Sequence, residues 1–485
     1  MSDITPIRSR LRLRVLSDSE LETIRSATLD VLGRVGVRFP SARALRVFAE
    51  HGAQVDQTKE IVRLPPELVT KAMANAPRSY TLSGRAEWTD LELDGVSTYF
   101  ATADCGPLTI DPVTGEERPS RKEDIARMAR VADHLSSIAF YWPLVSAQEY
   151  GAVASLHELD ASFNNTVKHV QTQVLMGARS ARYAIRMGEV IAGNAMRMRS
   201  NPPFSVLVCT IPPLGQDRDG IEGAMEFAQA GIPVGFMSLP TLGSTAPASP
   251  AGALVTGSAE VVSAMVLIQL VAPGAPVFYS LSASVMDPRT GAYLVATPQR
   301  YLCNSAAVQI GHAWGVPSMA SVFNCESPAP GTWELGRDSV YNALMVPMVG
   351  ADLAVGLGIL KASTLLVMEQ VLFDDEIFHT NRIVAEGIDV AAEELAVEEI
   401  VAVGPRGHFL LQEHTVRRAR ELWIPKLSHP DLLPEVDPPA DIQERARQKL
   451  EWILTTHIPQ PLEKAAQVEL TTILESAAGE LSVPG

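Results

Sequence analysis

IPVGFMSLPTLGSTAPASPAGALVTGSAEVVSAMVLIQLVAPGAPVFYSLS, residues 232–282, alternates two kinds of segment. A short apolar run at 232–239 is followed by a stretch of helical length at 251–271 and by a second short run at 276–282. Short strand-like runs separated by helical segments are typical of α/β architecture. The stretch therefore predicts one β/α unit and the strand that begins the next.

The same rhythm continues on both sides of this unit. Candidate strands lie at 99–105, 138–145, 167–175, 204–211, 232–239, 276–282, 318–323 and 352–357, and candidate helices at 121–135, 151–164, 178–193, 218–230, 251–271, 293–313, 333–349 and 363–372. Eight β/α units predict a (β/α)8 TIM barrel. A doubly wound sheet is the alternative, but it needs a glycine fingerprint, and the nearest match, Gly356-x-Gly358, follows the last strand.

The barrel is expected to carry an extension at each end. Residues 1–98 predict an N-terminal helical subdomain with a β-hairpin, residues 99–385 the barrel, and residues 386–485 a C-terminal helical cluster. In the first part, Ser17 or Ser19, then Ser41, and the Pro65-Pro66 pair are expected to start helices. The hairpin is expected to turn at Asp94-Gly95.

Composition limits the function classes. The chain has 485 residues, 46% of them hydrophobic and 20% charged, and a formal net charge of -16. The acidic balance without long runs of one sign argues against nucleic-acid and anionic-membrane partners. The most apolar stretches, 251–281 and 343–373, contain charged residues, so we expect buried elements and no membrane span. The sequence leaves a homo-oligomer open.

Four scattered cysteines, Cys105, Cys209, Cys303 and Cys325, indicate a reducing compartment, and the N-terminus lacks the apolar core of a signal peptide. We therefore expect a cytoplasmic protein. The thiols of Cys105, Cys209 and Cys325 fall near predicted strand ends, which leaves a catalytic zinc site open as an alternative. No paired cysteine or His-Glu-x-x-His motif supports it, so the expected metal content is none.

Active sites of TIM barrels lie at the C-terminal ends of the strands, here called the mouth. Aromatic and acidic residues are abundant near these predicted ends: Tyr99, Phe100, Tyr141, Trp142, Phe236, Tyr279, Phe323 and Trp333, with Asp104, Glu326, Glu334 and Glu369. Ring faces and negative charge suit a quaternary ammonium ion, which has no N–H to donate. The alternative for each aromatic residue is ordinary core packing.

Further polar candidates are Gln171 and Gln173 on the third strand and Asn324 on the seventh. His312, near the end of a helix, is a candidate catalytic residue together with Glu326 and Glu334. A structural histidine is the alternative for His312.

Several longer motifs resemble one known family. They are LETIRSATLDVLGRVGVRFPSARALRVFAEHGAQVD, LPPELVTKAMANAPRSYTLSGR, TGEERPSRKEDIARMARVAD, SLPTLGSTAPASPAG, MDPRTGAY and VMEQVLFDDEI, spread from about Leu16 to Ile383. Together they resemble the trimethylamine methyltransferase superfamily.

The resemblance implies a barrel enzyme that moves a methyl group from an N-methylated amine to the cobalt of a corrinoid protein or cobalamin. It implies that the corrinoid protein docks at the mouth and that this chain holds no cofactor tightly. Founding members carry pyrrolysine near the end of strand seven, where this chain has FNCESPAPGTWE. That difference indicates the non-pyrrolysine branch, whose substrates are quaternary amines such as glycine betaine.

A betaine also carries a carboxylate, and Arg289 and His312 are the predicted donors to it, with Gln171 and Gln173 as further candidates. Two other functions stay open at this point. One is a zinc-dependent thiol methyltransferase that uses the strand-end cysteines, and the other is a barrel that binds betaines without catalysis.

Overall fold

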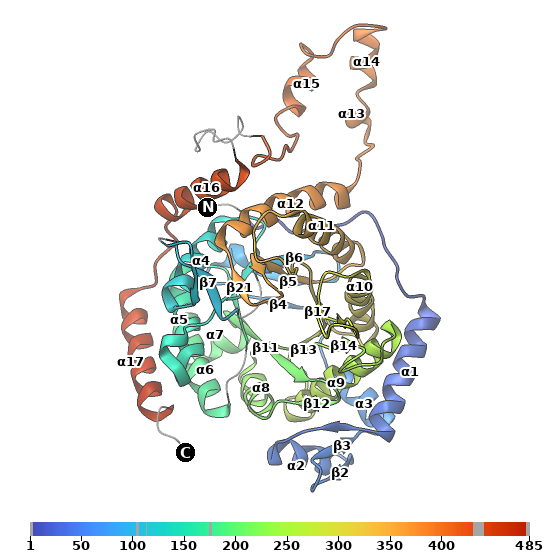
Figure 1. The fold of residues 1–485 in the computed structure, drawn as a ribbon, viewed down its shortest axis with the longest axis vertical. Helices are drawn as coiled ribbons and strands as arrows, with labels where there is room; N and C mark the ends of the chain where they lie inside the picture. Colours follow the sequence, from blue (N-terminus) through green and yellow to red (C-terminus); the bar gives the residue numbers. More distant parts are fainter. Residues whose placement is uncertain (1–2, 103–105, 113, 174–176, 430–440, 482–485) are drawn as a thin grey trace.

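Eight parallel strands form a closed barrel in the computed structural model, which describes residues 3–102, 106–112, 114–173, 177–429 and 441–481 (Figure 1). Around the barrel the strands are β6 (Tyr99–Thr102), β9 (Phe140–Tyr141), β10 (His169–Gln173), β11 (Phe204–Ile211), β13 (Val234–Ser238), β15 (Val277–Leu281), β18 (Ser318–Ser321) and β19 (Leu353–Leu357). The pairs β19–β6 and β10–β11 complete the ring. The predicted TIM barrel and its eight strands are confirmed.

One helix follows each strand and lies on the outside of the barrel (Figure 1). These helices are α4 (Lys122–His134), α5 (Ala154–Asn165), α6 (Ala178–Ala192), α8 (Arg218–Ala230), α9 (Pro250–Val271), α10 (Pro298–Ala313), α11 (Trp333–Met348) and α12 (Met368–Glu386). The last helix begins later than predicted because residues between β19 and α12 form two short strands, β20 (Ile359–Leu360) and β21 (Leu365–Leu366). Likewise β17 (Tyr293–Leu294) precedes α10.

Short strands and helices decorate the loops beyond the barrel strands. They are β7 (Leu108–Ile110), β8 (Glu117–Pro119), β12 (Gly215–Gln216), β14 (Thr241–Leu242), β16 (Ser284–Met286), the 3-10 helix Gln148–Val153 and α7 (Ala195–Ser200). Strands β14, β16 and β17 form one small sheet at the mouth, and β7, β8, β20 and β21 form another. These two sheets build the rim through which the barrel interior is reached.

Side chains alternate between the two faces of each barrel strand. The inner face contributes a compact cluster that includes Phe140, Leu207, Phe278 and Met319. Gly235 leaves room for the ring of Phe278 across the neighbouring strand, because a Cβ there would meet that ring at 2.0 Å. The outer face packs against the surrounding helices.

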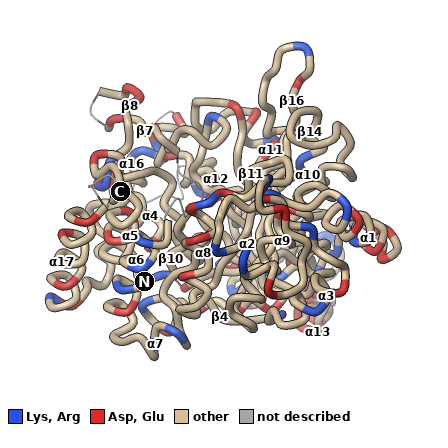
Figure 2. Tube along the Cα trace, turned by 90° about the horizontal axis from the view of Figure 1, so that it is seen from below, with Lys and Arg blue, Asp and Glu red and all other residues tan. Residues whose placement is uncertain are grey.

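A hairpin of β4 (Tyr80–Leu82) and β5 (Leu91–Leu93) closes the N-terminal end of the barrel. Its residues Leu82, Leu91 and Leu93 are fully buried in the same cluster as Phe278. In Figure 2, β4 lies at the end of the molecule opposite β14 and β16. The predicted turn at Asp94-Gly95 was wrong, because the chain turns between β4 and β5, through residues 83–90.

The remaining N-terminal elements are α1 (Asp18–Arg34), β1 (Val37–Arg38), α2 (Ala42–Glu50), β2 (Gln54–Asp56), β3 (Ile61–Arg63), α3 (Pro66–Met73) and the 3-10 helix Glu87–Thr89. Ser17 and Ser41 cap α1 and α2 through their side chains, as predicted. Helices α1 and α3 pack on α9. Among the described helices, α9 alone is long and apolar enough to span a membrane, and 78% of its most apolar window is buried.

The C-terminal part consists of α13 (Ala392–Leu395), α14 (Val397–Val403), α15 (Glu413–Arg418), α16 (Ile442–Thr456) and α17 (Lys464–Leu481). Helix α16 packs on α4 and α12, and α17 packs on α5 and α6. By contrast, α13, α14 and α15 contain no buried residue and extend away from the barrel as an arm (Figure 1). The C-terminal cluster therefore has one part that completes the barrel surface and one that projects from it.

Candidate active site at the mouth of the barrel

A small cavity of about 150 Å³ lies at the C-terminal ends of the strands. Its lining residues come from most barrel strands and the rim: Trp142, Gln173, Cys209, Met237, Leu239, Ser282, Tyr293, Val295, Arg300, Ser321, Asn324, Val355, Ala362 and Ser363. Pockets for drug-sized ligands measure roughly 300 to 1,000 Å³. This mouth cavity therefore suits a small molecule and lies where TIM-barrel active sites are found.

Three buried polar atoms of the mouth cavity have no hydrogen-bond partner among the described residues. They are the indole Nε1 of Trp142 and the amide oxygens of Gln173 and Asn324. Below them, the amide oxygen of Gln171 and the hydroxyl of Ser280 are in the same situation. An unsatisfied buried polar group costs about 1–3 kcal/mol. Such a concentration at one place indicates a site whose hydrogen bonds are completed by a ligand or by water.

Arg300 was not predicted from the sequence and is the only charged side chain among the described residues that line the mouth cavity. It is 3% exposed and lies in the first turn of α10. Its Nη1 donates to the carbonyl of Val295 at 3.0 Å, and its Nη2 donates to Ser321 Oγ at 2.9 Å and Ser282 Oγ at 3.3 Å. The sequence did contain a signal for Arg300. A cation in the first turn of a helix is unfavourable because it opposes the helix dipole, so an arginine there indicates another role.

Glu326 supports this arrangement from the rim. Its carboxylate accepts hydrogen bonds from the backbone N–H groups of Val295, at 2.5 Å, and Ala296, at 3.2 Å. The carbonyl of Val295 is in turn an acceptor for Arg300. The structure thus places this predicted catalytic residue outside the cavity lining, as an exposed side chain that fixes the loop before α10.

A strained turn forms another wall of the mouth cavity. Lys361, Ala362 and Ser363 have φ values of 52°, 51° and 71°, in the left-handed region that L side chains rarely adopt. The turn is held by hydrogen bonds from Ala362 N–H to the carbonyl of Cys325, at 2.8 Å, and from Asn324 Nδ2 to Ser363 Oγ, at 2.6 Å. Strain of this kind is often concentrated at functional sites.

Most residues of the predicted aromatic cage do not line the mouth cavity, so the cage prediction was wrong for them. Phe100 and Phe323 pack with each other and with α12, Tyr141 donates its hydroxyl to the carbonyl of Ile125 in α4, and Phe236 and Tyr279 lie in the cluster between barrel and helices. Tyr99 begins its strand at the closed end of the barrel, and Trp333 is 79% exposed on α11. Of the eight aromatics, only Trp142 lines the mouth cavity.

Of the predicted polar site residues, some line the mouth cavity and others lie elsewhere. Gln173 and Asn324 line the mouth cavity, and Gln171 is buried beneath it, with Nε2 3.6 Å from the sulfur of Met319. Glu334 is exposed in the first turn of α11. Asp104 lies outside the described residues.

Both predicted carboxylate donors are misplaced for a ligand in the mouth cavity. His312 lies at the opposite end of the barrel, because α10 runs away from the mouth, and its Nε2 is 2.9 Å from Asp352 Oδ2. Arg289 is 87% exposed and forms an ion pair with Asp287 in the loop between β16 and β17. The structure therefore assigns both residues local structural contacts.

The cysteines give a zinc site no support within the described chain. No group of three or more His, Cys, Asp or Glu residues is arranged there to hold a metal ion. Cys325 is fully buried beside Leu335, Leu360 and Leu365, and burial raises the pKa of its thiol to about 12. A thiol in that environment stays protonated near neutral pH, which is the wrong state for a metal ligand. Cys209 lines the mouth cavity and Cys303 is buried.

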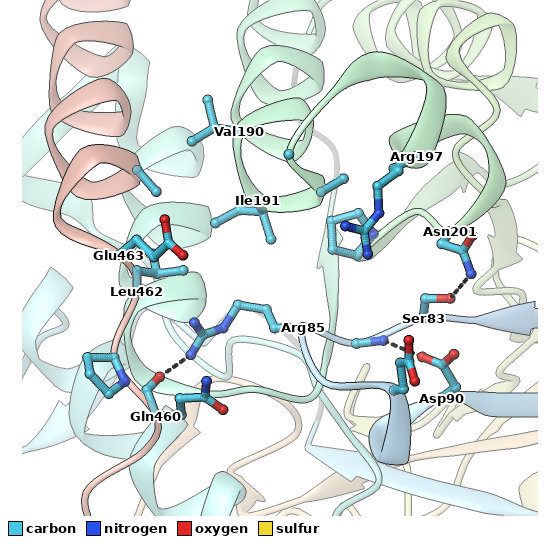
Figure 3. Close-up of a pocket in the computed structure, with 17 residues that line it drawn as sticks. Ser83, Arg85, Asp90, Val190, Ile191, Arg197, Asn201, Gln460, Leu462 and Glu463 are labelled. Atoms are coloured by element: carbon cyan, nitrogen blue, oxygen red, sulfur yellow. Dashed lines mark hydrogen bonds between the residues drawn. The ribbon is translucent and has the colours of Figure 1, made fainter.

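A larger cavity, of about 460 Å³, lies away from the mouth beside the turn between β4 and β5 (Figure 3). Arg85 crosses it and donates to the carbonyls of Thr166, at 2.9 Å, and Gln460, at 2.5 Å. Glu463 and Arg197 lie on its rim and are exposed. These bonds explain how the segment before α17 is attached to the barrel, and the location is not one used for catalysis in TIM barrels.

Comparison with known proteins gives the family of the chain. The family described as "Trimethylamine methyltransferase (MTTB)" matches residues 3–480. The chain belongs to the trimethylamine methyltransferase family. Within this family it is 31% identical over 470 residues to trimethylamine methyltransferase MttB of Desulfitobacterium hafniense (strain DSM 10664 / DCB-2), with 96% of this chain and 94% of that protein covered.

A second relative of this chain is named for a different amine. The glycine betaine methyltransferase of Desulfitobacterium hafniense (strain Y51) is 26% identical over 478 residues, with 97% of this chain and 98% of that protein covered. Among solved structures, the monomethylamine methyltransferase of Methanosarcina barkeri has a TM-score of 0.52 at 12% identity and covers 90% of this chain and 88% of its own. That structural likeness concerns the fold.

Proposed function

We propose that this protein transfers a methyl group from a quaternary amine, glycine betaine or a related betaine, to the cobalt of a corrinoid protein or of cobalamin. The observation that carries the proposal is the mouth cavity, where the indole of Trp142 meets the unpartnered amide oxygens of Gln173 and Asn324. An aromatic ring and amide oxygens attract an N-methylated cation without needing an N–H from it. The cavity is also small enough to discriminate against larger amines.

The choice of a quaternary amine rests on the chemistry of the leaving group. When the reduced corrinoid attacks a methyl carbon, the C–N bond breaks and its electron pair goes to nitrogen. A quaternary nitrogen then leaves as a neutral tertiary amine, and no proton is needed. The stretch FNCESPAPGTWE, at residues 323–334, supplies no activating group for a tertiary amine, because its thiol is buried and protonated and only Asn324 of these residues lines the cavity.

The protein's own contribution is to orient the amine and to remove water from it. Buried side chains hold the methyl group in a fixed direction, which lowers the entropic part of the barrier. Exclusion of water also protects a reduced corrinoid from side reactions. The acceptor is a second substrate in this proposal and approaches from the mouth, since the hairpin of β4 and β5 fills the other end.

The direct test mixes purified protein, cob(I)alamin or a reduced corrinoid protein, and one member of a betaine panel, and follows methylcobalamin by its absorbance spectrum. Formation of methylcobalamin with release of the demethylated amine is expected for at least one betaine. Gln173→Leu should slow it, whereas the exposed-site variant Glu334→Gln should not. Absence of product across glycine betaine, proline betaine, carnitine and butyrobetaine would contradict the proposal.

Metal analysis and calorimetry, added to this assay, separate two alternatives. A zinc-dependent thiol methyltransferase would contain stoichiometric zinc and lose zinc and activity together in Cys325→Ala. A betaine-binding barrel without catalysis would bind a betaine in calorimetry and give no demethylated product with either acceptor. The burial of Cys325 favours neither zinc binding nor nucleophilic attack by its thiol.

A further inference from the structure

The arm that carries α13, α14 and α15 exposes apolar side chains along its whole length. None of residues 386–426 is buried, although Ala385 and Leu427, on either side, are. Twelve large apolar side chains between Ile388 and Ile424 are 43% to 86% exposed. Exposed apolar side chains are ordinary when they occur singly, but a concentration of them marks an interaction site. The surface of the arm is therefore that of an interface.

Helix α14 shows this character most clearly. Val397, Ile400 and Val401 follow the spacing i, i+3, i+4, which places them on one face of the helix. In a folded protein such a face normally packs against another element, yet these three side chains are 53% to 70% exposed. In the segment between α14 and α15, Leu410 and Leu411 are 76% and 84% exposed. Both features indicate that a second surface covers the arm in solution.

The exposed apolar surface of the arm is large enough for a stable interface. Each partner of a typical stable complex contributes roughly 800 Å². Twelve side chains of valine to phenylalanine size, most of them at least half exposed, present on the order of 1,000 Å² of apolar area. The arm alone can therefore supply one side of such an interface.

The charges of the arm divide into two halves of opposite sign. Residues 389–399 contain five acidic side chains and no lysine or arginine, whereas residues 406–426 contain five basic side chains and two acidic ones. The halves already attract each other within one copy, where Glu393 and Arg417 form an ion pair of 2.7 Å. A surface of this kind is complementary to itself.

Four charges of the arm have no ion pair among the described residues. They are Glu398 and Glu399 in the acidic half and Arg406 and Arg420 in the basic half. In a twofold arrangement, a residue i that contacts j on the partner is matched by j contacting i. The acidic half of one arm then faces the basic half of the other, twice in the same dimer. Charge complementarity therefore favours a second copy of this chain as the occupant.

The position of the arm also favours a second copy over the methyl acceptor. In Figure 2, α13 lies toward the end of the molecule where β4 closes the barrel, and β14 and β16 mark the mouth at the opposite end. Figure 1 shows α14 and α15 extending away from the barrel. The acceptor approaches the mouth in the proposed function, so the arm does not lie on its path.

We propose that the arm pairs with the arm of a second copy of this chain, around a twofold axis, and that the protein is thereby a homodimer. The apolar side chains form the buried centre of the interface, and the charged residues form its rim. The opposite charges of the two halves fix the antiparallel direction of the arms. The inference is independent of the proposed methyl transfer, because it uses no residue of the mouth cavity.

Analytical ultracentrifugation of the whole chain at micromolar concentration tests the pairing. The wild type should sediment as a dimer. Leu410→Glu combined with Leu411→Glu should raise the dissociation constant of the dimer about 100-fold, because charges would enter an apolar interface. Met196→Glu, at an 82% exposed residue of α7, is the matched control and should stay dimeric. A monomeric wild type, or an unchanged mass in the leucine variant, would overturn the inference.

Charge reversal tests the twofold arrangement, even if the leucine variant does not fold. Glu398→Arg with Glu399→Arg makes the acidic half of the arm more basic, and Arg406→Glu with Arg420→Glu makes the basic half more acidic. Each of these variants alone should dissociate at low salt, because like charges then meet twice in the dimer. An equimolar mixture of the two should restore the dimer, because opposite charges meet again. No gain in dimer on mixing would overturn the twofold pairing.

Discussion

The inner and outer faces of the barrel strands have opposite characters, and Tyr141 and Trp142 show it within two residues. Tyr141 points outward and bonds to α4, whereas Trp142 points inward and lines the mouth cavity. The outer face holds most of the aromatic side chains near the strand ends, all well packed. The inner face holds amides whose side-chain oxygens have no hydrogen-bond partner among the described residues. Aromatic residues near the mouth therefore stabilise the fold where they lie on the outer face, and are available for ligand binding where they lie on the inner face.

Phe100→Ala tests the outer face and should give the largest effect. Phe100 is fully buried and packs edge-on against Phe323 and Phe378, with ring centroids 6.3 and 5.0 Å away. The variant should lose about 3–5 kcal/mol of unfolding free energy, since a large core side chain is replaced by a methyl group. Chemical denaturation measures it. Unchanged stability together with lost betaine binding would show that Phe100 belongs to the binding site.

Trp142→Leu tests the inner face at the aromatic wall. Loss of the ring should weaken glycine betaine and tetramethylammonium alike, by about 1–2 kcal/mol, the size of a desolvated cation–π contact. Calorimetry of both ligands measures the change. Tyr141→Phe is the matched control one residue away, and its affinity for both should equal that of wild type. An equal loss in the two variants would contradict the division between the faces.

Gln173→Leu separates stability from binding at a single inner position. The variant removes a buried amide oxygen that has no partner among the described residues, so the ligand-free protein should be as stable as wild type or more stable by about 1 kcal/mol. Betaine affinity should fall at the same time. Denaturation and calorimetry on the same preparation measure both quantities. A loss of stability together with unchanged affinity would show that Gln173 belongs to the packing core.

Ala362→Gly should give the smallest effect, on the wall formed by the strained turn. Ala362 has φ 51°, and glycine accepts that conformation without strain. The gain is partly offset by the larger entropy of glycine in the unfolded chain, so about 0.5 kcal/mol of stabilisation is expected. Ala126→Gly, inside helix α4, is the control and should be destabilising, because glycine lowers helix stability relative to alanine. Equal destabilisation of both variants would show that the turn is not strained.

The sequence located the barrel strands well but could not assign their faces. Strands of a parallel barrel are buried on both sides, so they lack the alternation of apolar and polar residues that marks an inner face. Tyr141 and Trp142 are equally hydrophobic in the sequence, and only the closed barrel distinguishes them. The predicted cage of eight aromatic residues failed for this reason, since only Trp142 lines the cavity.

The direction of helix α10 determines where two other residues lie relative to the site. Barrel helices begin at the mouth and end at the closed side, so a residue late in α10, such as His312, had to lie far from the site. By the same reasoning a residue in the first turn, such as Arg300, had to lie near it. The helix itself was predicted, but its start was placed five residues too early, at 293 rather than 298, which hid the first turn.

The hairpin of β4 and β5 has a consequence for the order of binding in the proposed reaction. Leu82, Leu91 and Leu93 fill the closed end, so among the described residues the barrel interior is reached from the mouth. In the proposed methyl transfer, donor and acceptor would both approach through the mouth, and the bulkier acceptor would cover it. The small amine would therefore bind first, and an ordered kinetic mechanism with the amine as the leading substrate is expected.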